Sequence, residues 1–265
     1  FTGTMDGVTS LEGVVSEGIR AIFGTPDANE TATGQSTLTL VNNGAIALGA
    51  GTAIRTWATT ASVENNAAIS TTAQYASAVS LQGSPGGAGS PATSADFVTT
   101  ADITVSGDQA DALQMVDMAD ASVTIGQSAT LTSGSGAQSY GIRLANITGT
   151  ADLAIAGAVA SAQGAAIIAQ GNVALGTLAI ALEGTGSLAS TSGQAINSQM
   201  ATTLGLAAGA SITGDVVLSD LADAVSVTGA TIDGDLVTGA GNDTVTFTDL
   251  AITGLIDLGD GDDLL

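Results

Sequence analysis

Residues 212–265 have the sequence ITGDVVLSDLADAVSVTGATIDGDLVTGAGNDTVTFTDLAITGLIDLGDGDDLL, which repeats itself every 20 residues. Each unit opens with an isoleucine, carries a glycine two residues later and places an aspartate eleven residues after its opening. The equivalent positions are Ile212, Ile232 and Ile252, then Gly214, Gly234 and Gly254, then Asp223, Asp243 and Asp263. A unit this short cannot close a hydrophobic core by itself, so the repeat predicts a stacked, one-dimensional fold.

The rest of the chain shows patterns that favour the same fold. Residues 38–40 (LTL) and 123–125 (VTI) alternate aliphatic and polar side chains, which places every second side chain on one face of a strand. All three arginines, Arg20, Arg55 and Arg143, follow a small residue and an isoleucine, so we expect them at equivalent positions in different coils. The sequence therefore predicts an all-β protein, a parallel β-helix (β-solenoid) of about 10–11 coils.

A small residue followed by an aliphatic one also predicts which side chains stack along the coils. The step recurs at intervals between 20 and 29 residues, which indicates coils of similar cross-section carrying loops of different length. The predicted column is Leu113, Ile142, Ile167, Ile196, Val225, Val245 and Leu265.

The domain organisation predicted is a single β-solenoid over residues 1–265. Residues 1–35 are either irregular first coils or an N-terminal cap, because residues 11–23 combine helical spacing with the small-isoleucine-arginine step. Residues 82–91 contain two of the three prolines among glycine and serine, and predict a loop that protrudes from the stack without joining a strand ladder. Residues 212–265 form the regular 20-residue coils.

Composition excludes several classes of function. The chain has 25 acidic residues, three arginines and no lysine, histidine or cysteine, which gives a net charge of −22. A Ser-His-Asp relay and a thiolate or imidazole zinc site are therefore impossible. The charge argues against nucleic acid as a partner and favours calcium or a basic partner. No stretch supplies the roughly 20 uninterrupted apolar residues of a transmembrane helix, so we expect no transmembrane segment in this chain.

Two glycine-rich turns inside the repeat predict a calcium site. The pattern Gly-x-Gly-x-Asp occurs at 239–243 and at 259–263 and resembles the calcium-binding nonapeptide of RTX proteins, although its leading glycine is replaced by Thr238 and Leu258. The resemblance implies Ca²⁺ as the cofactor. The residues it places around the metal are Gly239, Gly241, Asp243, Gly259, Gly261 and Asp263. The alternative is a tight turn whose aspartate caps the backbone of a neighbouring coil.

A polysaccharide-active enzyme is an alternative function, because parallel β-helices include pectin-cleaving enzymes. For a hydrolase the candidate carboxylates are Asp111, Asp117 and Asp120. For a lyase the chain has too few bases, since its three arginines lie far apart in the sequence. Aromatic platforms for sugars are scarce. We therefore expect no enzymatic activity.

Three sequence features together resemble the passenger region of bacterial autotransporters and related surface β-helix adhesins. They are the turn at 41–46 (VNNGAI), the step at 139–143 (SYGIR) and the closing turn at 239–245 (GAGNDTV). The resemblance covers most of the chain, and implies a right-handed β-helix outside a bacterial cell or on its surface. It implies a non-enzymatic adhesin or stalk that binds a host or surface glycan or protein receptor. The alternative is a structural subunit that self-associates through uncapped coil ends into an extracellular filament.

Overall fold

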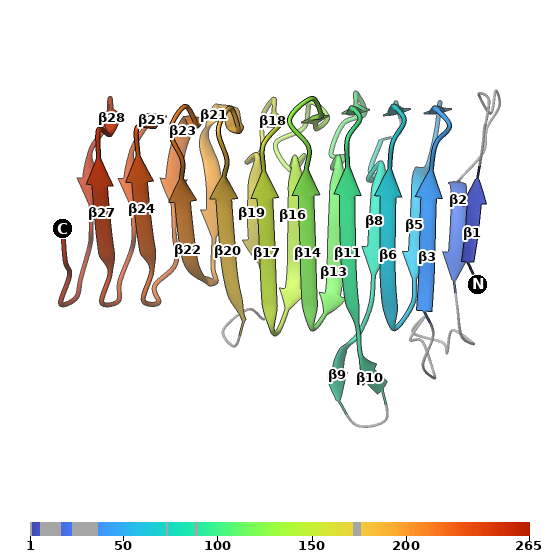
Figure 1. Ribbon diagram of the computed structural model, residues 1–265, viewed down its shortest axis with the longest axis horizontal. Helices are drawn as coiled ribbons and strands as arrows, with labels where there is room; N and C mark the ends of the chain where they lie inside the picture. The colour runs from blue at the N-terminus through green and yellow to red at the C-terminus, as the bar shows by residue number, and fades with distance from the viewer. Residues whose placement is uncertain (1, 6–16, 23–36, 73, 88–89, 172–175) are drawn as a thin grey trace.

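The computed structural model describes residues 2–5, 17–22, 37–72, 74–87, 90–171 and 176–265, and every regular element within these ranges is a β-strand. The chain winds into the parallel β-helix that the repeat predicts (Figure 1). In the same ranges there is no helix long and apolar enough to cross a bilayer.

Ten parallel strands, one from each coil, form the front sheet of Figure 1, in agreement with the predicted coil number. They are β1 (Thr2–Met5), β3 (Thr37–Asn42), β6 (Thr60–Asn65), β11 (Ser94–Thr99), β14 (Asp120–Ile125), β17 (Thr150–Ile155), β20 (Thr177–Leu182), β22 (Ala201–Leu206), β24 (Ala224–Thr228) and β27 (Thr244–Thr248).

The remaining parallel strands form a second sheet, to which each coil after the first contributes a short corner strand and a rear strand, and the first coil a rear strand within the described residues. The corner strands are β4 (Ile46–Leu48), β7 (Ile69–Thr71), β12 (Ile103–Val105), β15 (Thr130–Thr132), β18 (Ala158–Ser161), β25 (Thr231–Asp233) and β28 (Ala251–Ile252). The rear strands are β2 (Glu17–Ile22), β5 (Thr52–Trp57), β8 (Val79–Gln82), β13 (Leu113–Met118), β16 (Ile142–Ile147), β19 (Ile167–Gln170), β26 (Leu236–Val237) and β29 (Ile256–Asp257). Two strands, β21 (Ser187–Ser198) and β23 (Ser211–Val217), run through both positions.

The β-helix is right-handed. In Figure 1 the chain ascends each front strand, crosses at the top, descends along the rear strand and advances toward the C-terminus at the left. This is the usual hand of a parallel crossover, because right-twisted strands return onto their sheet more readily in that direction.

The core is one narrow column of aliphatic side chains between the front and rear strands. Each front strand points alternate residues inward, so that Leu40, Val63, Phe97 and Val123 stack in register and are nearly inaccessible to solvent. Branched and aromatic side chains suit such half-buried strands. Every coil therefore completes the core of its neighbours, which explains why no single repeat can fold alone.

The rear strands confirm most of the predicted stacking. Ile19 and Ile54 are paired, and Leu113, Ile142, Ile167 and Ile196 follow one another in register. The prediction is wrong beyond Ile196. Val216 is its neighbour in the column, whereas Val225 lies on the front sheet beside Leu204 and Val245. The two sheets carry the same pattern of aliphatic residues, so spacing alone could not tell them apart.

Two predicted irregular regions are partly described. Within residues 1–35, β1 pairs with β3 and β2 pairs with β5, while residues 1, 6–16 and 23–35 lie outside the described ranges. The predicted loop at 82–91 contains a small antiparallel hairpin, β9 (Pro85–Gly87) with β10 (Ser90–Ala92), which projects below the front sheet in Figure 1. The expectation that this segment forms no strand ladder is therefore wrong. The hairpin strands pair with each other, whereas Gln82 belongs to β8 and pairs with Trp57 and Val116 of the neighbouring coils.

Candidate functional site

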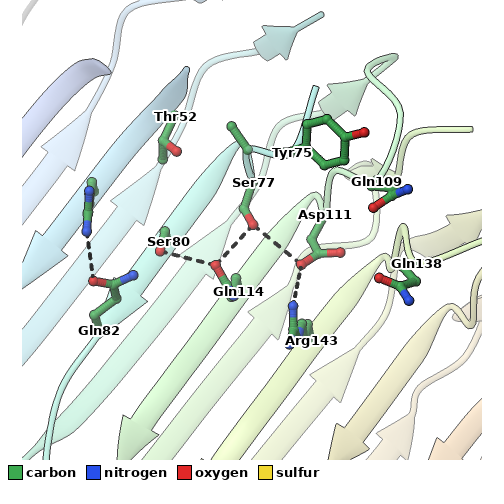
Figure 2. Close-up of a pocket in the computed structure, with 12 residues that line it drawn as sticks. Thr52, Tyr75, Ser77, Ser80, Gln82, Gln109, Asp111, Gln114, Gln138 and Arg143 are labelled. Atoms are coloured by element: carbon green, nitrogen blue, oxygen red, sulfur yellow. Dashed lines mark hydrogen bonds and ion pairs between the residues drawn. The ribbon is translucent and has the colours of Figure 1, made fainter. Parts of the chain in front are cut away.

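A polar cleft of about 370 Å³ opens on the outer face of the rear strands β5, β8, β13 and β16 (Figure 2). Its walls come from these strands and from the loops that precede β8, β13 and β16. The lining residues are Thr52, Arg55, Tyr75, Ala76, Ser77, Ser80, Gln82, Gln109, Asp111, Gln114, Gln138 and Arg143. Hydroxyl, amide and guanidinium groups predominate, and the set includes one carboxylate.

The floor of the cleft follows from the register of four neighbouring strands. Arg55 pairs with Ser80, Ser80 with Gln114, and Gln114 with Arg143. Three steps of about 4.8 Å separate the backbones of the two arginines by roughly 14 Å. Arg20 precedes Arg55 in the same register, so the prediction that the three arginines occupy equivalent positions is confirmed. The arginines are far apart in the sequence, but the coils bring them into one row on the rear strands.

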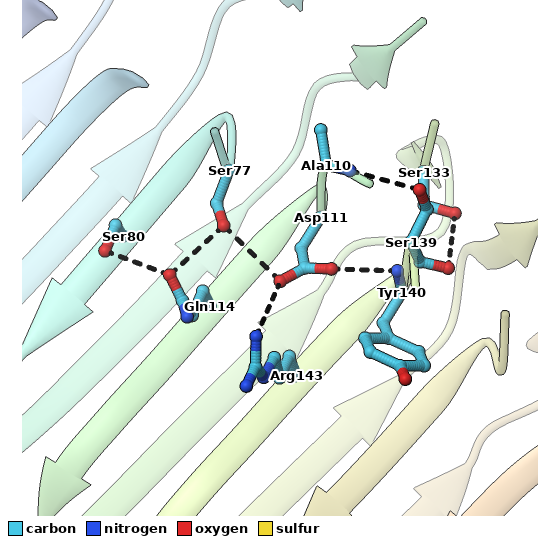
Figure 3. A network of polar contacts seen from close by, with 9 residues as sticks. All are labelled: Ser77, Ser80, Ala110, Asp111, Gln114, Ser133, Ser139, Tyr140 and Arg143. Carbon is cyan, nitrogen blue, oxygen red and sulfur yellow. Dashed lines mark hydrogen bonds and ion pairs between the residues drawn. The ribbon is translucent and has the colours of Figure 1, made fainter. Parts of the chain in front are cut away.

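Asp111 is the one carboxylate among the described residues that line the cleft, and it is only 4% exposed. Its Oδ1 accepts a hydrogen bond of 2.9 Å from the backbone amide of Tyr140, and its Oδ2 lies 4.0 Å from a guanidinium nitrogen of Arg143 (Figure 3). Burial raises the pKa of Asp111 from 3.8 to about 6, and the Tyr140 hydrogen bond and the Arg143 charge offset only part of that effect.

A hydrogen-bond network joins Asp111 to the middle of the cleft. The Ser77 hydroxyl lies 3.4 Å from Asp111 Oδ2 and 3.2 Å from Gln114 Oε1, and Ser80 Oγ lies 3.4 Å from the same Gln114 oxygen (Figure 3). The amide oxygen of Gln114 is thereby held from one side. Its amide nitrogen makes no hydrogen bond within the described part of the chain, which leaves both N–H donors for a ligand.

Each arginine of the cleft is held by a neighbouring glutamine. Arg55 donates a hydrogen bond of 3.2 Å to Gln82 Oε1. The Gln170 amide, oriented by its hydrogen bonds, places its oxygen 3.1 and 3.2 Å from two nitrogens of Arg143. These contacts fix the direction of the two guanidinium groups before any ligand arrives.

The rim contains backbone that ordinary residues seldom adopt. Tyr75 has φ +60° and Gln109 has φ +51°, both in the left-handed region. Such conformations cost on the order of 1–3 kcal/mol for non-glycine residues and are enriched at functional sites. The Tyr75 amide donates a 3.0 Å hydrogen bond to the Asp108 carbonyl, which ties the two rim loops together. The Tyr75 side chain remains 68% exposed above the cleft.

The wall beyond Asp111 is rigidly supported. The Ser139 hydroxyl accepts hydrogen bonds from the amides of Ala110 (3.1 Å) and Gly136 (3.2 Å), and the Ser139 carbonyl accepts one of 2.7 Å from Ser161. This buried serine fixes the loop that carries Gln138 and Tyr140. A second, smaller hollow of about 180 Å³ begins on the other side of Tyr140. Its lining residues are Ala137, Tyr140, Gln163, Gly164, Ala165, Ile168, Gln194 and Asn197.

The predicted calcium turns lie in the last coils, away from the cleft. The Asp243 carboxylate accepts a hydrogen bond of 2.8 Å from the Asp223 amide, and Asp263 accepts one of 2.9 Å from the Asp243 amide. Burial raises the pKa of Asp223 to about 6. Each carboxylate thus caps the backbone of the preceding coil, as the alternative prediction states. The second oxygen of Asp243, Oδ2, is buried without a hydrogen bond.

The glycines of these turns permit close stacking of backbone. A Cβ atom on Gly259 would lie 1.6 Å from the Gly239 carbonyl oxygen, and one on Gly261 would lie 1.5 Å from the Gly241 oxygen. Within the described ranges no three or more acidic, histidine or cysteine side chains group so as to hold a metal. The side chains as placed do not form a calcium cage, and calcium binding stays a prediction.

The three candidate carboxylates for hydrolysis are not brought together. Asp111 precedes β13 and Asp117 lies near its end, so about six residues, on the order of 20 Å, separate them. Asp117 accepts a hydrogen bond of 2.7 Å from the Asn146 side chain, while Asp120 caps the Thr150 amide at 2.9 Å. A glycosidase needs two carboxyl groups about 5 to 10 Å apart. Asp111 is therefore too far from Asp117 to form such a pair with it.

Comparison with known proteins adds no family assignment. No family model matches the chain, and no curated protein or solved structure matches it at a significant level. The interpretation of the cleft therefore depends on its own chemistry.

Sequence reasoning did not find Ser77, Ser80 or Gln114 as site residues. The signal that could have found them is the outward position next to each inward aliphatic residue of a rear strand. Aligning the coils on those aliphatic residues places Ser80 and Gln114 between Arg55 and Arg143.

Proposed function

We propose that this β-helix is a non-enzymatic adhesin of the autotransporter-passenger type, secreted or held on a bacterial cell surface, and that it binds a glycan receptor in the rear cleft. The observation that carries the proposal is the row Arg55, Ser80, Gln114 and Arg143 on the cleft floor. Hydroxyl, amide and guanidinium groups in a fixed row match the dense hydroxyl groups of a sugar chain.

The aromatic side chain at the rim supports a sugar ligand. Tyr75 is 68% exposed at the rim of the cleft, and its loop is hydrogen bonded to the next coil. A phenol ring combines an apolar face with a polar tip, which suits the mixed surface of a pyranose ring. The strained backbone of Tyr75 is then explained by the position that its ring must take.

The composition of the cleft favours binding over cleavage. Asp111 is the one carboxylate among the described lining residues, and it is 4% exposed and hydrogen bonded to the Tyr140 amide. Hydrolysis of a glycosidic bond ordinarily uses a pair of carboxyl groups. With one such group, the cleft supports recognition of a polysaccharide.

A glycan array probed with the full chain tests the proposal. We expect the chain to bind defined glycans. We expect Gln114→Ala to weaken the binding of each of them, because it removes the central amide. The matched control is Gln127→Ala, which removes an exposed glutamine between β14 and β15, outside the cleft lining. An array without binding, or equal effects of the two variants, would overturn the proposed site.

The filament alternative is tested separately by electron microscopy of the purified chain. Short isolated rods would contradict it. Long fibres with an axial repeat close to the length of one β-helix would favour it over an adhesin that acts as a single rod.

A further inference from the structure

The chain concentrates its positive charge in one place. It has 25 acidic residues against three arginines, and all three arginines lie in the same register on the rear strands. Two of them, Arg55 and Arg143, line the cleft. At physiological ionic strength the charges more than about 8 Å away are largely screened, so a ligand in the cleft mainly experiences these two guanidinium groups and the buried Asp111 carboxylate beside Arg143, which leaves a positive balance.

The guanidinium groups are presented in a way that suits planar anions. Gln82 holds Arg55, and Gln170 holds two nitrogens of Arg143 on one side. The Asp111 carboxylate approaches Arg143 only to 4.0 Å, which is longer than a charge-assisted hydrogen bond. A fixed arginine fork binds carboxylate or sulfate through two parallel hydrogen bonds, and a neutral hydroxyl uses this geometry less well.

The groups between the arginines are uncharged. Ser80 and Gln114 separate Arg55 from Arg143 on the cleft floor, and Gln114 keeps both amide N–H donors available within the described part of the chain. An anionic group at each end and hydroxyl groups in the middle would match this order of side chains. A linear polymer that carries acidic groups at intervals has that arrangement.

A second hollow follows the cleft along the helix axis. The register that contains Arg143 passes through Ile168 to Asn197, and these two residues line the second hollow beyond Tyr140. From Arg55 to Asn197 there are five strand steps, about 24 Å in total. Gln163 and Gln194 line this second hollow, so two hollows with polar side chains follow one another along the helix axis.

We propose that the ligand is an acidic linear glycan, which lies across the rear strands parallel to the helix axis and places carboxylate or sulfate groups against Arg55 and Arg143. This inference rests on the proposed glycan-binding function and names the class of glycan. Ser80 and Gln114 bind hydroxyl groups between the two anionic contacts, and the hollow at Asn197 takes the next part of the chain.

Titration calorimetry with three matched probes tests the inference. The probes are oligogalacturonates of increasing length, the same oligomers with every carboxylate methyl-esterified, and a sulfated galactan oligomer. We expect the uronate to bind and the ester to bind at least about tenfold more weakly, because a hydrogen bond to a charged group contributes roughly a factor of ten or more. Affinity should rise with oligomer length until the chain exceeds the cleft. Binding of the sulfated oligomer instead of the uronate would assign the anion as sulfate within the same class.

Two variants locate the anionic contacts. Arg55→Gln and Arg143→Gln should each lower the affinity for the acidic oligomer at least about tenfold and leave the affinity for the esterified oligomer nearly unchanged. Because Arg143→Gln leaves Asp111 without its cation, the double variant Asp111→Asn with Arg143→Gln removes both charges and provides a second, neutral test. Melting curves show whether each variant is folded, and Gln127→Ala is the control.

The outcomes separate this inference from the function on which it rests. If the acidic and the esterified oligomer bind equally well, and Gln114→Ala weakens the binding of both, the inference of an acidic ligand is overturned and glycan binding remains supported. Absence of binding by all probes together with an empty glycan array would overturn both. Formation of an unsaturated uronate, detected by ultraviolet absorbance, would overturn the non-enzymatic function while leaving the ligand class standing.

Discussion

Replacing Asp111 with asparagine should make the protein more stable at neutral pH. The side chain is 4% exposed, and burial raises its pKa from 3.8 to about 6. At about 1.36 kcal/mol per pKa unit, the ionised carboxylate is disfavoured in the folded state by roughly 3 kcal/mol. Asparagine keeps an oxygen that accepts the Tyr140 amide hydrogen bond and carries no charge, so it removes this cost.

The sign of the pH dependence follows from linkage. Below about pH 4 Asp111 is protonated in the folded and unfolded chain, and above about pH 6 it is ionised in both. Between these values the folded chain binds the proton more tightly, so wild-type stability falls as the pH rises. Across this window the free energy of unfolding of the variant should fall by about 3 kcal/mol less than that of wild type. Asp223, whose pKa is raised in the same way, should account for part of the pH dependence that the variant keeps.

Urea unfolding at several pH values measures this difference. The single tryptophan, Trp57, is 8% exposed and lies on β5, two rear strands from Asp111, so its fluorescence reports on the coils that carry the cleft. Asp120→Asn is the matched control, because Asp120 caps a backbone amide from an exposed position. Parallel pH profiles for wild type and Asp111→Asn, or a less stable variant at pH 7.5, would refute the reasoning.

Four further predictions concern the turns and the cleft. Asp243→Ala should cost about 1–3 kcal/mol, because it leaves a buried amide without an acceptor, whereas Asp243→Asn should be close to wild type in thermal melting. If calcium binds there, melting in millimolar calcium and in EDTA should differ, and identical curves would contradict the calcium prediction. Gly241→Ala should cost at least about 1–3 kcal/mol, since φ is +130° and the new Cβ would lie 2.7 Å from the Leu221 carbonyl; Gly49→Ala, with no atom within 4 Å, should change urea unfolding by less than about 0.5 kcal/mol. An acidic oligomer should bind more tightly at pH 5 than at pH 7.5, because protonation of Asp111 leaves the Arg143 charge unopposed, and calorimetry that shows no pH dependence would contradict this role.

The β-helix could be predicted from the sequence because its coils obey strict local rules. The 20-residue period placed Ile212, Ile232 and Ile252 in one stack, and the structure pairs them. The small-isoleucine-arginine step likewise identified equivalent positions on the rear strands. Stacking is a nearest-neighbour property, so a correct register for one coil carries over to the next.

The cleft could not be predicted from local patterns, because its residues come from coils 25 to 34 residues apart. Loops of different length hide the alignment of Arg55 with Arg143, which made the arginines look remote from one another. For the acidic residues, closeness in the sequence was misleading. Asp111 and Asp117 are close in sequence, but an extended strand carries them to opposite ends of β13.

A crystal structure of the full chain with a saturating acidic oligosaccharide tests the central claim most directly. We expect density for a sugar chain across Ser80 and Gln114, with its anionic groups at Arg55 and Arg143 and its long direction parallel to the helix axis. Density confined to another surface, or a cleft that holds only solvent at saturating ligand, would contradict it.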